Sequence, residues 1–209
     1  MILEELAIAV ETGDMKKVQA LIPQGLADGV DPQDLLDKGL LAGMAALGAR
    51  FKAGEVFVPE VLIAARALNA GTVLLKDKLV AGQSVSKGKV VIATVSGDLH
   101  DIGKNLVLMM LESTGFEVID LGVDVPVEAV VEAVRENKPD ILAMSALLTT
   151  TMAFQKDIVE ALKVAGLRDG LKIMIGGAPV TQDFCDNIGA DSYSPDAPGA
   201  ADAALALLS

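Results

Sequence analysis

The stretch from Lys89 to Val95 reads Lys-Val-Val-Ile-Ala-Thr-Val, a continuous run rich in β-branched residues. Such a run is typical of a strand that is buried on both faces of a parallel sheet. The next ten residues, Ser96 to Asn105, read Ser-Gly-Asp-Leu-His-Asp-Ile-Gly-Lys-Asn. They place polar side chains on a glycine-flanked turn directly after the strand. Together the two stretches predict a βα unit with a polar loop at the carboxyl end of its strand.

Four more strand-like runs follow, with starts spaced by roughly 20 to 30 residues, as βα units require. We predict these strands at 116–121, 140–145, 171–175 and 191–194. Helices fit the segments between and after them, at about 103–114, 127–137, 151–165, 181–188 and 200–208. This alternation predicts an α/β domain built on a doubly wound, five-stranded parallel sheet.

The first 82 residues have a different pattern, because helix signals follow one another with short breaks. Helices are predicted at 3–11, up to Ile22 ahead of Pro23, from Asp31 to about Gly54, and from Pro59 to about residue 75. Four helices with short connections indicate a small antiparallel bundle. We expect three segments: a helical bundle over residues 1–82, a linker over 83–88 and a sheet domain over 89–209.

Charge and composition exclude several classes of protein. Seventeen Lys and Arg stand against 29 Asp and Glu, a net charge of −12, which argues against binding to nucleic acid or to an anionic membrane surface. No apolar run is long enough to span a membrane and no signal peptide is visible, so a cytoplasmic protein is predicted. Cys185, the single cysteine, excludes an internal disulfide and a zinc site built on several thiolates. Phosphoryl and hydride transfer are disfavoured, because neither a P-loop nor a dinucleotide fingerprint occurs.

The loop after the first strand carries His100, the only histidine. Ligands of open parallel sheets bind beyond the carboxyl ends of the strands, which is where this loop lies. Asp98 is two residues away, and a nearby carboxylate orients an imidazole and fixes its tautomer. A single histidine cannot hold a free metal ion, so a metal at His100 needs further ligands from a cofactor. The alternative is an ordinary surface or capping histidine.

Hydroxyls and glycines follow the later strands. Ser145 and three threonines up to Thr151 follow the third strand; one of them can cap a helix, and the surplus suggests contacts to a ligand. Gly176 and Gly177 follow the fourth strand and form either a tight turn or a close approach for a flat group. Tyr193, the only tyrosine, lies at the end of the fifth strand.

Three short motifs together resemble the signature of the cobalamin-binding domain of methionine synthase and related proteins: Asp98-x-His100-x-x-Gly103, Ser145-x-Leu147 and Gly176-Gly177. The segment from Glu55 to Glu60, with the helix after it, resembles the helical cap domain that precedes the cobalamin domain in this family. The resemblance covers nearly the whole chain and is greatest to the stand-alone corrinoid proteins of multicomponent methyltransferase systems. It implies a flavodoxin-like sheet domain behind an N-terminal four-helix bundle cap.

The resemblance implies that the chain binds cobalamin, including methylcobalamin, with His100 replacing the cofactor's own base below the cobalt. Asp98 would hydrogen-bond the imidazole and Thr151 would hydrogen-bond Asp98, so that a proton is taken up as the methyl group leaves. The other residues implied to contact the cofactor are Leu99, Asp101, Ile102, Gly103, Ser145, Leu147, Thr149, Gly176, Gly177 and Tyr193, with Phe57 and Val61 of the cap over the upper face.

The resemblance also implies a carrier subunit without catalysis of its own. A substrate:corrinoid methyltransferase would load the methyl group, a second methyltransferase would pass it to tetrahydrofolate or coenzyme M, and a reductive activase would rescue oxidised cobalt. Three alternatives stay open at this stage. They are a subunit of a cobalamin-dependent mutase, a cobalamin sensor that controls transcription, and a flavodoxin-like small-molecule-binding domain without cobalamin.

Overall fold

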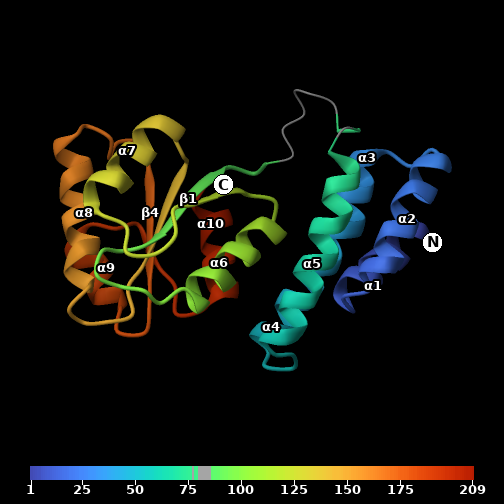
Figure 1. Cartoon of the computed structure of the whole chain (residues 1–209), viewed down its shortest axis with the longest axis horizontal. Coiled ribbons are helices and arrows are strands. Elements are labelled where there is room, and N and C mark those ends of the chain that lie inside the picture. Colours follow the sequence, from blue (N-terminus) through green and yellow to red (C-terminus); the bar gives the residue numbers. More distant parts are fainter. Residues whose placement is uncertain (77, 80–85) are drawn as a thin grey trace. The chain divides into compact units, whose positions relative to one another are not determined.

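The computed structural model describes residues 1–76, 78–79 and 86–209 (Figure 1). The chain divides into two compact units, which we call the helical unit (Met1–Val85 with Ser113–Gly115) and the sheet unit (Ser86–Glu112 with Phe116–Ser209). Residues 83–85 of the expected linker lie outside the described residues. Each unit is described separately below.

The sheet unit contains a five-stranded, all-parallel sheet with the strand order β2-β1-β3-β4-β5. This order is that of flavodoxin-like folds, so the predicted fold class is confirmed. In the register, Val90 of β1 lies beside Val118 of β2 and Ile141 of β3. The strands are β1 (Lys89–Thr94), β2 (Glu117–Asp120), β3 (Ile141–Ser145), β4 (Lys172–Gly176) and β5 (Ser192–Tyr193).

Helices cover both faces of this sheet (Figure 1). One buried cluster joins the strands to Val130, Ile158 and Ile188, which belong to α7, α8 and α9. A second cluster, on the strand residues of opposite parity, includes Leu111 of α6 and Ala204 of α10. The helices are α6 (Ile102–Ser113), α7 (Val127–Asn137), α8 (Met152–Val164), α9 (Gln182–Ile188) and α10 (Ala197–Leu207).

The last helix begins three residues earlier than the predicted start at residue 200. The Asp196 carboxylate accepts a hydrogen bond from the Gly199 N–H at 2.7 Å and so caps α10. Pro198 then lies in the first turn, where its missing N–H has no helical acceptor to lose.

The helical unit contains α1 (Ile2–Glu11), α2 (Met15–Ala27), α3 (Pro32–Asp34), the π-helical segment η1 (Leu35–Leu41), α4 (Ala42–Lys52) and α5 (Val58–Leu75). Asp31 caps α3 as predicted, because its carboxylate accepts the Gln33 N–H at 2.7 Å. The predicted helix from Asp31 to Gly54 is a succession of α3, η1 and α4. The wider π turn keeps Leu35, Leu36 and Leu40 buried.

The prediction that the second helix stops before Pro23 is wrong. Helix α2 continues through this proline to Ala27. Buried residues on both sides of Pro23 explain the continuation, since Ile22 is fully buried and Gly25 packs closely against Leu35. Burial of this apolar face offsets the helical hydrogen bond that a proline removes.

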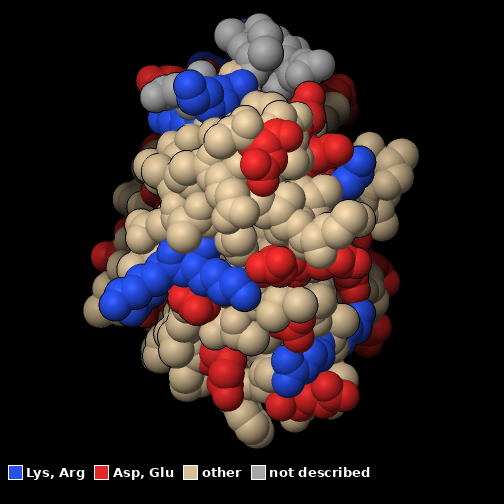
Figure 2. Space-filling view, turned by 90° about the vertical axis from the view of Figure 1, so that its right-hand side faces the viewer, with Lys and Arg blue, Asp and Glu red and all other residues tan. Residues whose placement is uncertain are grey.

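Among the described residues, one helix, α5, is long and apolar enough to cross a membrane on length and composition alone. Core helices pass the same test, and α5 packs against α2 while burying Val61, Ala64 and Leu68. On the face drawn in Figure 2, acidic and basic side chains are interleaved over the described residues, as on a solvated surface. The cytoplasmic location stays a prediction.

Candidate functional site

A buried carboxylate in the loop after β1 holds the histidine of the chain. The Asp98 side chain is fully buried, whereas the His100 side chain is 54% exposed. Asp98 Oδ1 lies 2.7 Å from His100 Nδ1 and accepts the His100 backbone N–H at 3.1 Å. The imidazole is therefore anchored through Nδ1, which leaves Nε2 as the ring nitrogen available to a ligand.

The other oxygen of Asp98 joins this loop to the loop after β3. Asp98 Oδ2 accepts the Leu147 N–H at 2.7 Å and the Thr151 hydroxyl at 2.8 Å. Thr151 is buried and precedes α8, but its hydroxyl makes no capping bond to that helix. The same hydroxyl lies 2.9 Å from the Leu148 carbonyl, so its one hydrogen has two acceptors within reach.

These contacts determine the charge of Asp98. Burial alone would raise its pKa, but the hydrogen bonds from Leu147, His100 and Thr151 outweigh burial and hold the pKa well below its usual range. Asp98 is therefore an anion at neutral pH. An anionic partner selects the tautomer of the neutral imidazole that donates from Nδ1, so the lone pair lies on Nε2. A lone pair at that atom is what ligation of a metal requires.

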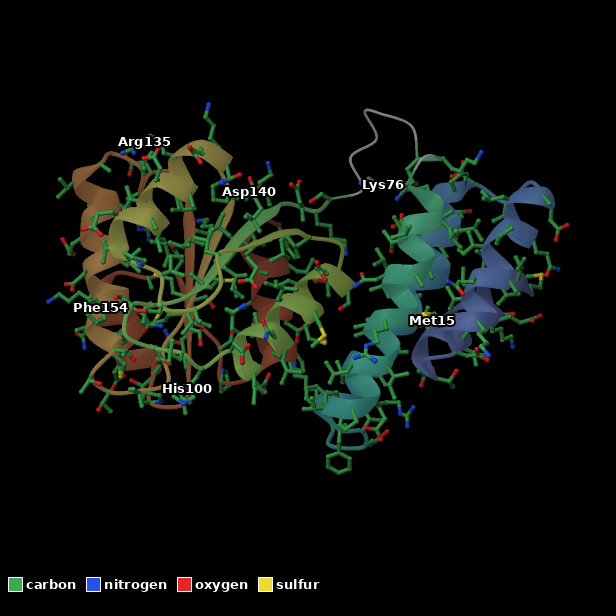
Figure 3. All side chains as sticks on the ribbon, in the orientation of Figure 1. Met15, Lys76, His100, Arg135, Asp140 and Phe154 are labelled. Carbon is green, nitrogen blue, oxygen red and sulfur yellow. The ribbon has the colours of Figure 1, made fainter. Side chains whose placement is uncertain are left out.

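Large apolar side chains are exposed around His100. Leu99 and Ile102 are 72% and 75% exposed, and Leu147 and Leu148 on the neighbouring loop are 38% and 43% exposed. A group of exposed apolar side chains around one polar atom is typical of a binding surface. Figure 3 shows His100 at the opposite end of the sheet unit from Arg135 and Asp140, on the side of the carboxyl ends of the strands.

The predicted glycines have two different explanations. A Cβ on Gly177 would lie 1.8 Å from the Ala146 carbonyl oxygen, and the residue has φ +127°, so the protein's own backbone requires glycine there. Gly176 is also tight, with the Ser194 oxygen 3.3 Å from the built Cβ. A Cβ on Gly103 would meet nothing within 4 Å. Packing within the chain therefore gives no reason for this glycine, and the open space beside it suits a ligand.

The remaining predicted residues divide between the site and its surroundings. Ser145 ends β3 and is partly buried, while Thr149 is exposed in the loop that follows. Asp101 directly precedes α6, and its carbonyl accepts the Asn105 N–H at 2.7 Å. Tyr193 lies in β5 and packs against the core cluster of α7–α9. In the helical unit, Phe57 is 67% exposed and Val61 is fully buried, so Phe57 has surface to offer a ligand.

Sequence reasoning missed the residues outside the loop between β1 and α6 that hold it in place. We call this loop, residues 95–101, the histidine loop. The Thr94 hydroxyl donates to the His100 carbonyl at 2.9 Å, and the Gly97 N–H donates to Asp124 Oδ1 at 2.7 Å. Lys104 is buried and paired with Asp120 at 2.7 Å. The sequence contains one signal for such contacts, since two aspartates, at 120 and 124, flank Gly122 around the end of the second predicted strand.

The residues present fit a large, flat, mostly apolar cofactor that carries its own metal. Within residues 1–76, 78–79 and 86–209, no group of three or more His, Cys, Asp and Glu could hold a bare metal ion. His100 can therefore supply one ligand, and the others must come with the metal. The apolar side chains around His100 and the open space beside Gly103 suit the face and the edge of such a group.

Family models match both parts of the chain. Residues 88–203 match a family model described as the B12 binding domain, and residues 2–76 match a second model with the same description. These two matches cover the sheet domain with its histidine loop and the helical bundle, respectively.

Named relatives match over most of their length. The trimethylamine corrinoid protein of Methanosarcina barkeri is 45% identical over 191 residues, which cover 90% of this chain and 88% of that protein. Dimethylamine corrinoid protein 1 of Methanosarcina acetivorans is 46% identical over 208 residues, 99% of this chain and 97% of that protein. Among solved structures, the methanol:cobalamin methyltransferase complex MtaBC of Methanosarcina barkeri matches with a TM-score of 0.91 and 34% identity, covering 99% of this chain and 79% of that chain.

Proposed function

Because the chain belongs to the family of B12-binding corrinoid proteins and binds cobalamin, we propose that it is the methyl-carrying subunit of a methylated-amine methyltransferase system. Bound cobalamin supplies a cobalt centre that accepts a methyl group and gives it up again. The observation that carries the proposal is the bonded series Thr151–Asp98–His100, which ends in a half-exposed imidazole among apolar side chains. The residues of this series are the machinery that the chain contributes.

In this proposal, His100 would hold the cobalt of the cofactor. Its Nε2 carries the lone pair, because Asp98 receives the hydrogen on Nδ1 at 2.7 Å. The same hydrogen bond to the buried Asp98 holds the ring in one orientation, which would favour ligation of the cobalt through Nε2.

Thr151 and Leu147 keep the Asp98 carboxylate in place. The Leu147 N–H cannot leave Asp98 Oδ2 without moving the loop after β3, whereas the Thr151 hydroxyl can turn between Asp98 Oδ2 and the Leu148 carbonyl. This hydroxyl can therefore donate to either acceptor without a change in the main chain. With the cofactor bound, the exposed apolar side chains of Leu99 and Ile102 would help to exclude water from the surroundings of His100.

The partners in the proposal follow from the relatives and from the resemblance in sequence. Relatives at 45% and 46% identity are named for trimethylamine and dimethylamine, which supports a methylated amine as the methyl donor and a substrate:corrinoid methyltransferase as the loading partner. A second methyltransferase would pass the methyl group to tetrahydrofolate or coenzyme M, and a reductive activase would restore oxidised cobalt. In the same proposal, residues 1–82 form the cap, with Phe57 above the corrin, 83–88 the linker and 89–209 the cobalamin-binding domain.

A visible spectrum of the loaded protein tests the proposal. The full chain is mixed with methylcobalamin and desalted, beside His100→Ala and the charge control Asp157→Asn, at an exposed position of α8. The wild type and Asp157→Asn should retain about one cobalamin per chain with the cofactor's own base displaced and a histidine ligand in its place. His100→Ala should lose the histidine-ligated spectrum. A spectrum that His100→Ala leaves unchanged would contradict ligation by His100.

Methyl transfer is the second readout. The protein loaded with reduced cobalamin is supplied with trimethylamine and a trimethylamine:corrinoid methyltransferase, and formation of methylcobalamin is followed by its absorbance. The proposal expects methylation of the wild type and of Asp157→Asn, and a large loss for His100→Ala. Methylation of cobalamin only from donors other than methylated amines would contradict the proposed donor class.

A further inference from the structure

A buried lysine lies four residues after the histidine and outside the Thr151–Asp98–His100 series. Lys104 is 2% exposed in the first turn of α6. Its Nζ donates to Asp120 Oδ2 at 2.7 Å and to Asn105 Oδ1 at 2.8 Å. A lysine buried to this degree is rare, because removing its charge from water is unfavourable unless the charge is paired. The buried ion pair therefore indicates that this position requires a positively charged side chain.

The partner of Lys104 is connected to His100 through the last residue of β2 and the loop after it. We call this segment, residues 120–124, the β2 loop. Asp120 Oδ1 accepts the Gly122 N–H at 2.9 Å, and the Gly122 carbonyl accepts the Thr94 N–H at 3.0 Å. The Thr94 hydroxyl in turn donates to the His100 carbonyl at 2.9 Å. These bonds and the covalent chain from His100 to Lys104 form a closed ring.

The same β2 loop also holds the beginning of the histidine loop. Asp124 Oδ1 accepts the Gly97 N–H at 2.7 Å, and the Asp124 N–H donates to the Asp98 carbonyl at 3.0 Å. Asp124 adopts φ +52°, a left-handed conformation that aspartate tolerates better than most side chains. The histidine loop is thus held at its start, at His100 and at its end.

We propose that Lys104 is a positioning residue that, through Asp120 and the β2 loop, fixes the main chain of His100 and so aims the imidazole. This inference rests on the proposed ligation by His100 and adds the residue that makes it possible. The histidine loop depends on such bonds, because residues 99 to 103 are all exposed and bury little apolar surface. Without Lys104, the carboxylate of Asp120 loses this ion pair, and the first turn of α6 loses its bond to the β2 loop.

Two readouts on the full chain test the proposal. In ¹⁵N-labelled protein loaded with unlabelled cobalamin and reduced to Co(II), a histidine ligand splits the electron paramagnetic resonance lines into doublets, whereas the cofactor's own base would split them into triplets. The doublet is the nitrogen splitting meant below. In the cofactor-free protein, amide hydrogen exchange of residues 98–102 reports how firmly the loop is held. Lys104→Met should lose the nitrogen splitting from most of the bound cobalt and exchange these amides about tenfold faster or more. Lys104→Arg, which keeps the charge and the donors, should retain the splitting.

A matched control separates positioning from general stability. Arg168 forms a partly buried pair with Asp191 at 2.8 Å in the same unit, in the segment that precedes β4. Arg168→Met should lower the melting temperature but leave the nitrogen splitting and the exchange of residues 98–102 unchanged. If Lys104→Met does not fold, the double variant Lys104→Met/Asp120→Leu takes its place, since replacing both members of a buried pair by apolar residues is often neutral for stability. It should fold and still lose the splitting.

The outcomes distinguish this inference from the proposed function. One result would overturn the positioning role of Lys104 but leave ligation by His100 standing. In that result, His100→Ala loses the nitrogen splitting, whereas Lys104→Met keeps both the splitting and the wild-type rates of hydrogen exchange. Absence of the nitrogen splitting in the wild type would overturn the proposed ligation by His100. It would also overturn the proposal that Lys104 orients the imidazole for ligation. In that case, hydrogen exchange in the cofactor-free protein decides whether Lys104 holds the histidine loop. Wild-type exchange rates in Lys104→Met would show that it does not.

Discussion

The two edges of the parallel sheet use aspartates differently. At the amino edge, Asp140 and Asp191 precede β3 and β5, and their carboxylates accept the backbone N–H groups of Lys89 and Ile173, both at 2.7 Å. These bonds tie neighbouring strands together at their starts. At the carboxyl edge, Asp98 is fully buried, and its partners come from the loops after β1 and β3.

The aspartates at the two edges differ in the groups that their carboxylates bind. The Asp191 side chain is 24% exposed and also pairs with Arg168, so its bonds complete the sheet and an ion pair. Asp98 accepts hydrogen bonds from two loops, and one of the donors is a half-exposed imidazole. The same functional group therefore stabilises strands at one edge and prepares a ligand at the other. Paired substitutions at the two edges test this contrast.

The largest effect is expected for Gly177→Ala at the carboxyl edge. The new Cβ would overlap the Ala146 carbonyl at 1.8 Å in a backbone conformation of φ +127°. Strain and overlap together should lower the free energy of unfolding by roughly 4 kcal/mol. Gly189→Ala, before β5 at the amino edge, is the matched control. Its φ is +76°, but the nearest atom is 3.7 Å away, so about 1 kcal/mol is expected.

Urea unfolding of the cofactor-free variants measures both losses. Equal losses for Gly177→Ala and Gly189→Ala would mean that β4 does not approach Ala146 as closely as the structure shows. The second glycine of the Gly-Gly pair would then be free for a role in ligand contact, as the sequence alone suggested. A much larger loss at Gly177 assigns this glycine to the backbone of the site.

The next effect is expected for Asp98→Asn. An asparagine places an NH₂ group where the carboxylate accepts hydrogen bonds, so at least one donor from Leu147, Thr151 or His100 loses its acceptor. We expect the free energy of unfolding to fall by about 3 kcal/mol at neutral pH. Asp191→Asn, at a partly exposed position, should cost about 1 kcal/mol.

The contribution of Asp98 should depend on pH in a defined direction. Hydrogen bonding lowers the pKa of Asp98 in the folded chain below its unfolded value of about 4. The stabilisation is thus complete above that pH and is lost as the pH falls toward the pKa of the folded state. Urea unfolding of wild type and Asp98→Asn should differ most at neutral pH and converge in acid. A difference that grows as the pH falls would contradict an ionised Asp98.

Most of the fold could be predicted from the sequence because its signals are local. The apolar run at Lys89–Thr94 and the alternation of strands and helices identify the parallel sheet, and Asp31 with Pro32 marks a helix start. Pro23 misled the prediction, because a local helix-breaking preference was outweighed by burial of Ile22 and Gly25. Burial of that kind depends on residues distant in the sequence.

The site could be predicted only in part, for the same reason. His100 and Asp98 are two residues apart, so their contact is visible in the sequence, and the family resemblance added Thr151. The Leu147 N–H that binds Asp98 is a backbone group, which carries no sequence signal. Lys104 and Asp120 are 16 residues apart on different elements, and only the fold brings them together.

The smallest effect is expected for Thr151. Thr151→Val keeps the shape but removes the hydroxyl that donates to Asp98 Oδ2 at 2.8 Å, and we expect a loss of about 1.5 kcal/mol in unfolding free energy. Thr151→Ser keeps the hydroxyl and should stay within about 0.5 kcal/mol of the wild type. Both variants are measured by urea unfolding and, when loaded with Co(II) cobalamin, by the nitrogen splitting of the resonance lines.

The pair of variants separates two ways of holding Asp98. If the hydroxyl is needed, valine weakens both the fold and the ligation by His100, and serine restores both. If valine behaves like serine, the Leu147 N–H and the two His100 donors suffice for Asp98, and the Thr151 hydroxyl serves the Leu148 carbonyl, its other acceptor at 2.9 Å. The carboxyl edge would then resemble the amino edge, where carboxylates rely on backbone N–H groups. Restoration by serine would instead make the side-chain donor the feature that separates the two edges.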